Sequence, residues 1–99
     1  MRSNPIRQVW AAGGTVLNGW LAVPNVFTAE IMASRGWDSL TIDMQHGLVD
    51  YQAATTMLAA VATSDSAPVI RVPWLDAASV MKALDAGARG FLPKTMAAQ

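Results

Sequence analysis

The chain has 99 residues, enough for one domain, and its 53% hydrophobic and 14% charged content excludes a disordered tail. Seven basic and seven acidic residues cancel, so there is no basic excess for binding nucleic acid or an anionic membrane. Apolar stretches such as residues 17–23 are far shorter than the roughly 20 residues of a membrane span, and the polar residues 1–8 lack the apolar region of a signal peptide. The chain has no cysteine, which fits a reducing compartment, and we expect a soluble cytoplasmic α/β protein.

Apolar runs alternate along the chain with stretches of helical spacing. Residues 1–14 read as a lead-in segment that closes on Gly13 and Gly14, a loop signal. The apolar runs predict four strands, at residues 15–23, 39–43, 68–72 and 90–93. The stretches between them predict three helices, capped at their amino ends by Asn25, Asp50 and Asp76. Gly36 and Gly87 are expected to end the first and third of these helices.

The predicted order is β-α-β-α-β-α-β, which implies right-handed crossovers and parallel strands. Trp20, His46 and Arg71 each fall near a strand end, 26 and 25 residues apart. A unit of this length repeated four times is half of a (β/α)8 TIM barrel. We therefore expect residues 1–99 to form a single partial barrel domain. An open doubly wound sheet is the alternative, but the sequence has no G-x-G-x-x-G or G-x-x-x-x-G-K-[ST] loop for a nucleotide.

Two ionisable residues at strand ends are candidates for chemistry. His46, the only histidine, could act as a general base near neutral pH, or could simply close a polar loop after its strand. Arg71 interrupts the apolar third strand, and a guanidinium in that position needs an anion. Composition does not decide whether that anion is a substrate carboxylate or an aspartate of the chain.

Asp85 and Trp20 are weaker candidates when each is taken alone. Asp85 falls near the carboxyl end of the third predicted helix, where the helix dipole disfavours an acid. It is either exposed to solvent or the hydrogen-bond partner of an imidazole, as in catalytic histidine–carboxylate pairs. Trp20 is either a core residue or a pocket wall. The six methionines read as packing residues.

Three segments carry a resemblance to a known family. They are GWDSLTIDMQHG at residues 36–47, PVIRVP at 68–73 and VMKALDAGARG at 80–90. The first closely resembles a pattern of the HpcH/HpaI aldolase family, G-[FW]-D-x-[LV]-x-[IV]-D-x-[EQ]-H, and the other two resemble its P-x-[VI]-R-[VP] and L-D-x-G-A-x-G segments. They stand in the family's order and at its separations, so the resemblance spans nearly the whole chain.

The resemblance implies a (β/α)8 barrel, often a hexamer, that cleaves 4-hydroxy-2-oxo acids to pyruvate and an aldehyde with a divalent metal, Mg²⁺, Mn²⁺ or Co²⁺. It implies that His46 is the catalytic base, that Asp85 is the acid paired with it, and that Arg71 grips the oxo-acid carboxylate and steadies the enolate. It also implies that Trp20 lines the substrate pocket and that Asp43 and Gln45 support the metal–water shell. The family's metal ligands, a Glu and an Asp, lie on later strands, so no metal ligand is expected within this chain.

By this resemblance the chain corresponds to the amino-terminal half of a family barrel, as a fragment or a shortened reading frame, and we expect it to be inactive alone. Two other functions stay open. The first is a non-catalytic half-barrel that self-associates, or pairs with the missing half, through its exposed sheet edges. The second is a thioester lyase of the citrate lyase or malyl-CoA lyase kind, which rests on Pro93-Lys94.

Overall fold

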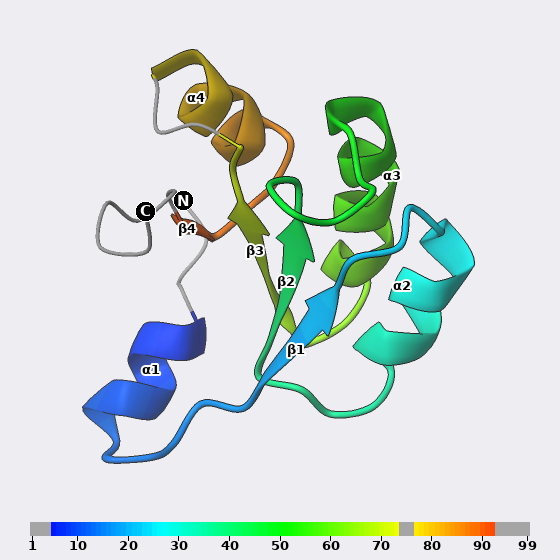
Figure 1. Cartoon of the computed structure of the whole chain (residues 1–99). Coiled ribbons are helices and arrows are strands. Elements are labelled where there is room, and N and C mark those ends of the chain that lie inside the picture. Colours follow the sequence, from blue (N-terminus) through cyan, green and yellow to red (C-terminus); the bar gives the residue numbers. More distant parts are fainter. Residues whose placement is uncertain (1–4, 74–76, 93–99) are drawn as a thin grey trace.

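The computed structural model describes residues 5–73 and 77–92, in which helices and strands alternate (Figure 1). The strands are β1 (Asn18–Leu21), β2 (Ser39–Asp43), β3 (Ala67–Arg71) and β4 (Gly90–Leu92). The helices are α1 (Pro5–Ala11), α2 (Val26–Ala33), α3 (Tyr51–Ala62) and α4 (Ala77–Asp85). None of these helices has the length and apolar character that crossing a bilayer would require.

The four strands form one parallel sheet in the order β1-β2-β3-β4. Each strand therefore lies beside the next one in the sequence, as in a (β/α) barrel. A doubly wound sheet instead reverses its strand order at a switch point, where its ligands bind. The sequential order confirms the predicted parallel (β/α) arrangement over the doubly wound alternative.

The strand register separates the two faces of the sheet. One face carries the apolar side chains of Leu21, Ile42 and Ile70, which occupy equivalent positions on three neighbouring strands. These side chains are almost fully buried in a core shared with α2, α3 and α4. Burying one such side chain contributes roughly 1.5–3 kcal/mol. The opposite face, which carries Thr41 and Asp43, is the face on which the charged groups meet.

Local signals fixed the helix ends as predicted. The Asn25 side chain accepts a hydrogen bond from the Thr28 N–H at 2.9 Å, and Asp50 accepts one from the Ala53 N–H at 2.8 Å. Each satisfies a backbone donor that the first turn of a helix leaves unpaired. Gly36 follows α2 with a φ of 85°, the left-handed conformation common just after a helix. The third predicted cap, Asp76, lies outside the described residues.

Three boundaries differ from the sequence-based expectation. The predicted lead-in contains α1, a seven-residue helix with no buried residue, so no apolar stripe marked it. β1 is four residues long although residues 15–23 were expected, because only its middle pairs with β2. β3 begins and ends one residue earlier than expected. The predicted end of β4, Pro93, lies outside the described residues.

Candidate active site

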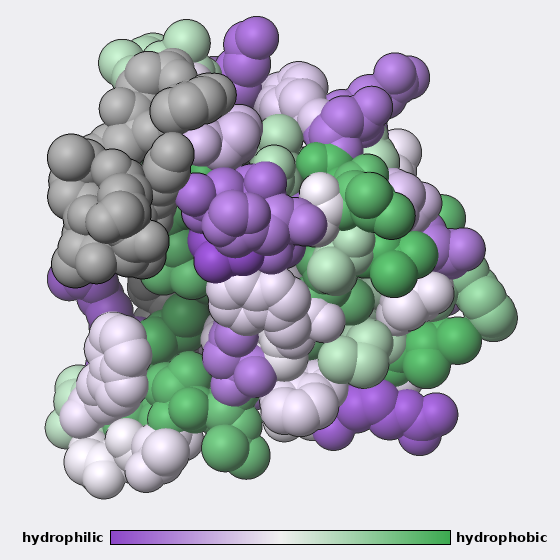
Figure 2. All heavy atoms as spheres, in the orientation of Figure 1, coloured by the Kyte–Doolittle hydropathy of each residue, from purple (hydrophilic) through white to green (hydrophobic). Residues whose placement is uncertain are grey.

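Charged and polar groups gather at the carboxyl ends of β2 and β3, where Figure 2 shows hydrophilic atoms over the tips of both strands. Asp43 is the last residue of β2, Arg71 is the last residue of β3, and the register places them side by side. Because the carboxyl ends of parallel strands meet at one edge of a sheet, two residues 28 apart in sequence become neighbours.

Asp43 and Arg71 form a two-pronged ion pair. Arg71 Nε donates to Asp43 Oδ1 at 3.1 Å, and Arg71 Nη2 donates to Asp43 Oδ2 at 2.5 Å. The Asp43 side chain is 4% exposed and that of Arg71 is 24% exposed. Two parallel charge-assisted hydrogen bonds fix the plane of the guanidinium as well as its position.

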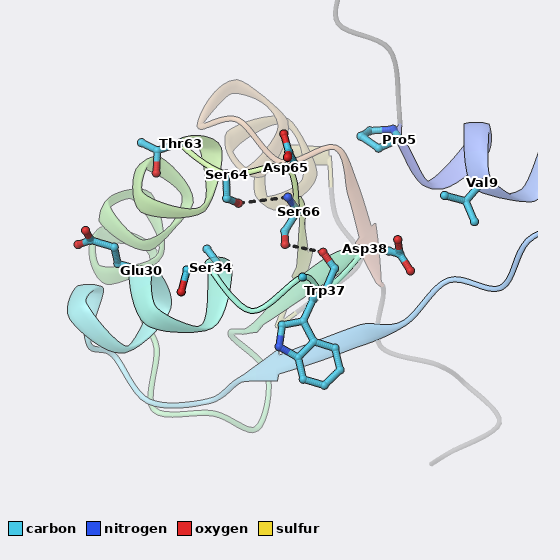
Figure 3. Close-up of a pocket in the computed structure, with 12 residues that line it drawn as sticks. Pro5, Val9, Glu30, Ser34, Trp37, Asp38, Thr63, Ser64, Asp65 and Ser66 are labelled. Carbon is cyan, nitrogen blue, oxygen red and sulfur yellow. Dashed lines mark hydrogen bonds between the residues drawn. The ribbon is translucent and has the colours of Figure 1, made fainter.

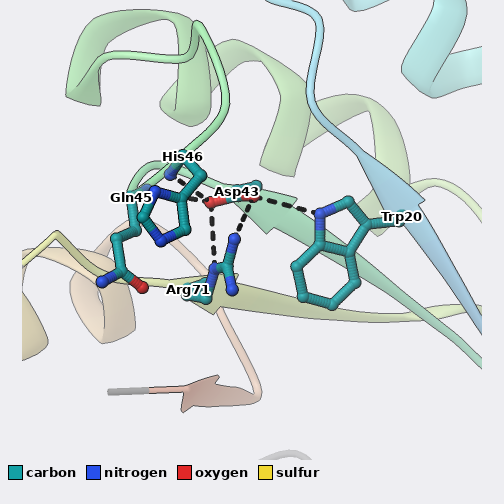
Figure 4. A network of polar contacts seen from close by, with 5 residues as sticks. All are labelled: Trp20, Asp43, Gln45, His46 and Arg71. Carbon is teal, nitrogen blue, oxygen red and sulfur yellow. Dashed lines mark hydrogen bonds and ion pairs between the residues drawn. The ribbon is translucent and has the colours of Figure 1, made fainter. Parts of the chain in front are cut away.

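Three further donors converge on Asp43 (Figure 4). The indole Nε1 of Trp20 donates to Oδ2 at 3.1 Å. The backbone N–H groups of Gln45 and His46 donate to Oδ1 at 2.9 and 3.0 Å. The Trp20 ring also lies 5.0 Å from the Arg71 guanidinium carbon, within cation–π range. Asp43 therefore joins β1, β2, β3 and the loop that follows β2.

The same contacts determine the charge state of Asp43. Burial alone would raise the pKa of its carboxyl group, because a buried charge loses its hydration. The Arg71 guanidinium and the N–H groups of His46, Trp20 and Gln45 act in the opposite direction and outweigh burial. They hold the pKa of Asp43 well below its usual range, so Asp43 is ionised at any physiological pH.

The structure identifies the anion that the sequence left open for Arg71. Asp43 takes the Nε–Nη2 side of the guanidinium. Arg71 has five N–H donors, and the pair with Asp43 uses two of them. The N–H donors left on Nη1 and Nη2 lie on the edge of the guanidinium that Asp43 does not contact. The pair with Asp43 already fixes the orientation of that edge.

His46 presents its side chain to solvent beside this pair. Its backbone N–H is bonded to Asp43, and within the described residues its imidazole makes no hydrogen bond. Figure 4 shows the imidazole, the Gln45 side chain and the guanidinium on the same side of the loop. Both imidazole nitrogens are thus available to a ligand that also reaches Arg71.

The structure does not bring Asp85 to His46. Asp85 is the exposed last residue of α4, and four residues later the Arg89 N–H donates to the carbonyl of Pro68, near the amino end of β3. His46 follows the carboxyl end of β2, and no hydrogen bond joins the two side chains in the described part of the chain. The expected His46–Asp85 pair therefore stays a prediction, with Asp85 exposed at the end of α4 and His46 exposed after β2.

The expected role of Asp43 in a metal–water shell stays a prediction, and its contacts within the described residues are all with protein donors. Its two oxygens together offer about four lone-pair positions, and five protein N–H donors already occupy them. Over residues 5–73 and 77–92, no three His, Cys, Asp or Glu side chains are placed to hold a metal ion. The described residues therefore do not fit a metal centre. Gln45 reaches Asp43 through its backbone N–H rather than its side chain.

Sequence reasoning missed one residue of this face, Asn18. Its side-chain oxygen accepts hydrogen bonds from Ser39 Oγ at 2.7 Å and Thr41 Oγ1 at 2.9 Å. It ties β1 to β2 below the ion pair and so holds the strand that carries Trp20. A polar residue two positions before Trp20, on the same face of the predicted strand, was the available signal.

The HpcH/HpaI aldolase/citrate lyase family model matches residues 18–99, which include every strand of the sheet and the Asp43–Arg71 pair. The chain belongs to this family. Among solved structures, an HpcH/HpaI aldolase/citrate lyase family protein from Burkholderia cenocepacia J2315 superposes with a TM-score of 0.82 at 35% identity. That match covers 94% of this chain and 38% of the Burkholderia chain. The family membership and the predicted partial barrel are thereby confirmed.

Curated family members of known name are also similar. A hydroxypyruvate/pyruvate aldolase from Rhizorhabdus wittichii is 37% identical over 89 residues, which are 90% of this chain and 36% of the relative. A 4-hydroxy-2-oxo-heptane-1,7-dioate aldolase from Salmonella dublin is 35% identical, over 90% of this chain and 34% of the relative. The chain thus spans about a third of the length of the curated relatives it matches, and these relatives are aldolases.

Proposed function

We propose that this chain supplies the base and the anion-binding arginine of an aldolase that reversibly cleaves 4-hydroxy-2-oxo acids to pyruvate and an aldehyde. The observation that carries the proposal is the orientation of Arg71, which Asp43 holds so that its other N–H donors, unpaired within the described residues, lie beside the exposed imidazole of His46. The names of the curated relatives support the reaction class, since both are aldolases of 2-oxo acids.

The cleavage needs one proton transfer and one site of charge stabilisation. The base takes the proton of the 4-hydroxyl group, the C3–C4 bond breaks, and its electron pair forms the enolate of pyruvate as the aldehyde leaves. Neutral His46 is suited to take the proton near neutral pH. The N–H donors left on Arg71 are suited to bind the carboxylate and the developing enolate oxygen, and a donor fixed in advance needs no reorganisation during the reaction.

Trp20 and Gln45 are proposed to shape the substrate site rather than to react. Trp20 covers one side of the guanidinium and is 43% exposed, so its remaining surface faces the space where a substrate would lie. We also propose that a divalent ion, Mg²⁺, Mn²⁺ or Co²⁺, takes part through ligands other than the described residues, and that turnover requires those ligands.

Ligand binding to the folded 99-residue chain tests the proposal. Pyruvate and oxalate, a planar analogue of the enolate, are titrated with and without Mg²⁺ or Mn²⁺ while heat and the NMR signals of His46 are followed. We expect oxalate to perturb the imidazole signals and Arg71→Ala to abolish the effect. Arg35→Ala, a change at an exposed arginine just after α2, is the matched control and should leave binding intact. Binding that survives Arg71→Ala, or no perturbation of His46, would contradict the proposal.

Self-association of this chain is a second candidate function, favoured by its exposed apolar side chains. Phe27 on α2 is 66% exposed and Leu48 after β2 is 82% exposed, and Figure 2 shows apolar atoms over α2. β1 and β4 are also the two edges of the sheet, which offer unpaired backbone groups. Sedimentation would separate the alternatives, since a monodisperse dimer with cooperative unfolding supports this candidate and a stable monomer opposes it. The thioester lyase alternative rests on Pro93 and Lys94, which lie outside the described residues.

A further inference from the structure

The loop between β2 and α3 passes very close to the chain leaving β1, and Gly47 lies at the closest point. A Cβ atom at Gly47 would collide with the Asp43 carbonyl oxygen. It would also lie only 3.1 Å from the Ala22 carbonyl oxygen and 3.2 Å from Ala22 Cα. All three are backbone atoms, which cannot turn aside as a side chain could. The φ of Gly47 is not positive, so a side chain here would disturb the packing of the loop rather than strain its backbone conformation.

Hydrogen bonds hold the loop on both sides of this glycine. Before it, the N–H groups of Gln45 and His46 are bonded to the Asp43 carboxylate. After it, the Leu48 N–H donates to the Ala22 carbonyl at 3.0 Å, although the Leu48 side chain is 82% exposed. Val49 then enters the core at 4% exposure. The backbone carrying His46 is thus fixed between Asp43 and the end of β1.

We infer that Gly47 is a positioning residue for His46, because its missing side chain lets the loop close onto Ala22 and so sets the imidazole relative to Arg71. The catalytic importance of this placement of His46 rests on the proposed function. A displacement of about 1 Å by a residue outside the chemistry can lower a rate about 100-fold. We expect Gly47→Ala to lower the kcat of the active protein by about that factor, with a smaller change in KM, since Arg71 is held independently by the Asp43 side chain.

A pair of glycine variants tests the placement without any ligand. Gly90→Ala is the matched control, because a Cβ there would meet only Val69 Cγ2 at 4.0 Å and its φ is not positive. His46 is the only histidine, so its imidazole NMR signals need no separate assignment. We expect Gly47→Ala to shift them while the Ile42 and Ile70 methyl signals stay in place, and Gly90→Ala to leave all of them unchanged. Unshifted imidazole signals in a folded Gly47→Ala protein would overturn the inference.

Amide hydrogen exchange in the unsubstituted chain gives an independent answer if Gly47→Ala does not fold. The Leu48 amide should exchange at least about 100-fold more slowly than an unprotected amide, because its hydrogen bond to Ala22 must open first. Exchange at the unprotected rate would overturn the inference. Neither measurement involves substrate, so both can succeed while oxalate fails to bind, and that result would count against the proposed function alone.

Discussion

The two ends of the sheet are both rich in polar side chains but use them in different ways. At the amino end lies a hollow of about 670 Å³, between the start of α1, the end of α2 and the α3–β3 loop (Figure 3). Three carboxylates and four hydroxyl groups line it: Glu30, Asp38, Asp65, Ser34, Thr63, Ser64 and Ser66. At the carboxyl end, the Asp43 network lies at the strand tips, where Asp43 is buried and Arg71 and His46 are partly or largely exposed.

Two of the side chains that line this hollow form hydrogen bonds with backbone groups. Asp38 Oδ2 accepts the Leu17 N–H at 2.8 Å, and Ser66 Oγ donates to the Trp37 carbonyl at 2.6 Å. At the carboxyl end, charged side chains bond to one another, and Arg71 and His46 keep polar atoms available to a ligand. The size of a hollow is therefore a poor guide to chemistry here. In (β/α) barrels generally, the amino end of the strands contributes to stability and the carboxyl end carries the reacting groups. The two ends of this sheet differ in the same sense.

The largest stability effect is expected from Asp43→Asn. The variant keeps the shape of the side chain but loses the charge and one acceptor, and turns an amide NH₂ toward donors that include the Arg71 guanidinium. Removing one partner of a buried pair costs about 3–5 kcal/mol, and the lower value of about 3 kcal/mol is expected because Arg71 retains contact with water. Urea unfolding at pH 7 measures this loss. A loss below about 1 kcal/mol would show that the network does not stabilise the fold.

The pH dependence of stability should isolate the same carboxylate. The unfolded chain binds a proton at Asp43 near its ordinary pKa of about 3.9, whereas the folded chain binds it only at lower pH. The stabilisation is therefore complete above about pH 5 and is lost as the pH falls toward the folded pKa. Urea unfolding between pH 7 and pH 3 should show a steeper loss in the unsubstituted chain than in Asp43→Asn. Parallel curves would contradict the depressed pKa.

A smaller effect is expected from Trp20→Phe, which keeps an aromatic face against Arg71 and removes only the indole donor to Asp43. The lost hydrogen bond to a charged group corresponds to about 1–2 kcal/mol of unfolding free energy. Trp20→Ala should cost more, since it also removes the cation–π contact. Equal losses in the two variants would mean that the ring face contributes nothing.

Much of this architecture could be predicted because its signals are local. β2 matched its predicted span, residues 39–43, and the caps Asn25 and Asp50 formed as expected, since each depends on residues within a few positions in the sequence. α1 was missed because a short helix that buries no residue leaves no apolar periodicity to detect.

The contacts of the site depend instead on how strands align. The sequence left the anion for Arg71 undecided, although Asp43 and Arg71 are the last residues of adjacent parallel strands and the register could have paired them. The His46–Asp85 pairing came from a family pattern, and it stays a prediction because no hydrogen bond joins the two side chains in the described residues. Gly47 gave no signal, since its role is set by a contact with Ala22 across 25 positions of sequence.

The smallest effect is expected at the amino end, from Asp38→Asn. The amide oxygen can still accept the Leu17 N–H, and the original bond is exposed to water, so we expect a loss of about 0.5–1 kcal/mol in urea unfolding. The imidazole signals of His46 and the binding of oxalate should not change, because Asp38 precedes the strand whose far end carries the Asp43 network. Asp38→Asn thus removes the same charge as Asp43→Asn from the opposite end of β2. If it altered oxalate binding as strongly, the two ends of the sheet would share one function and the distinction between them would be wrong.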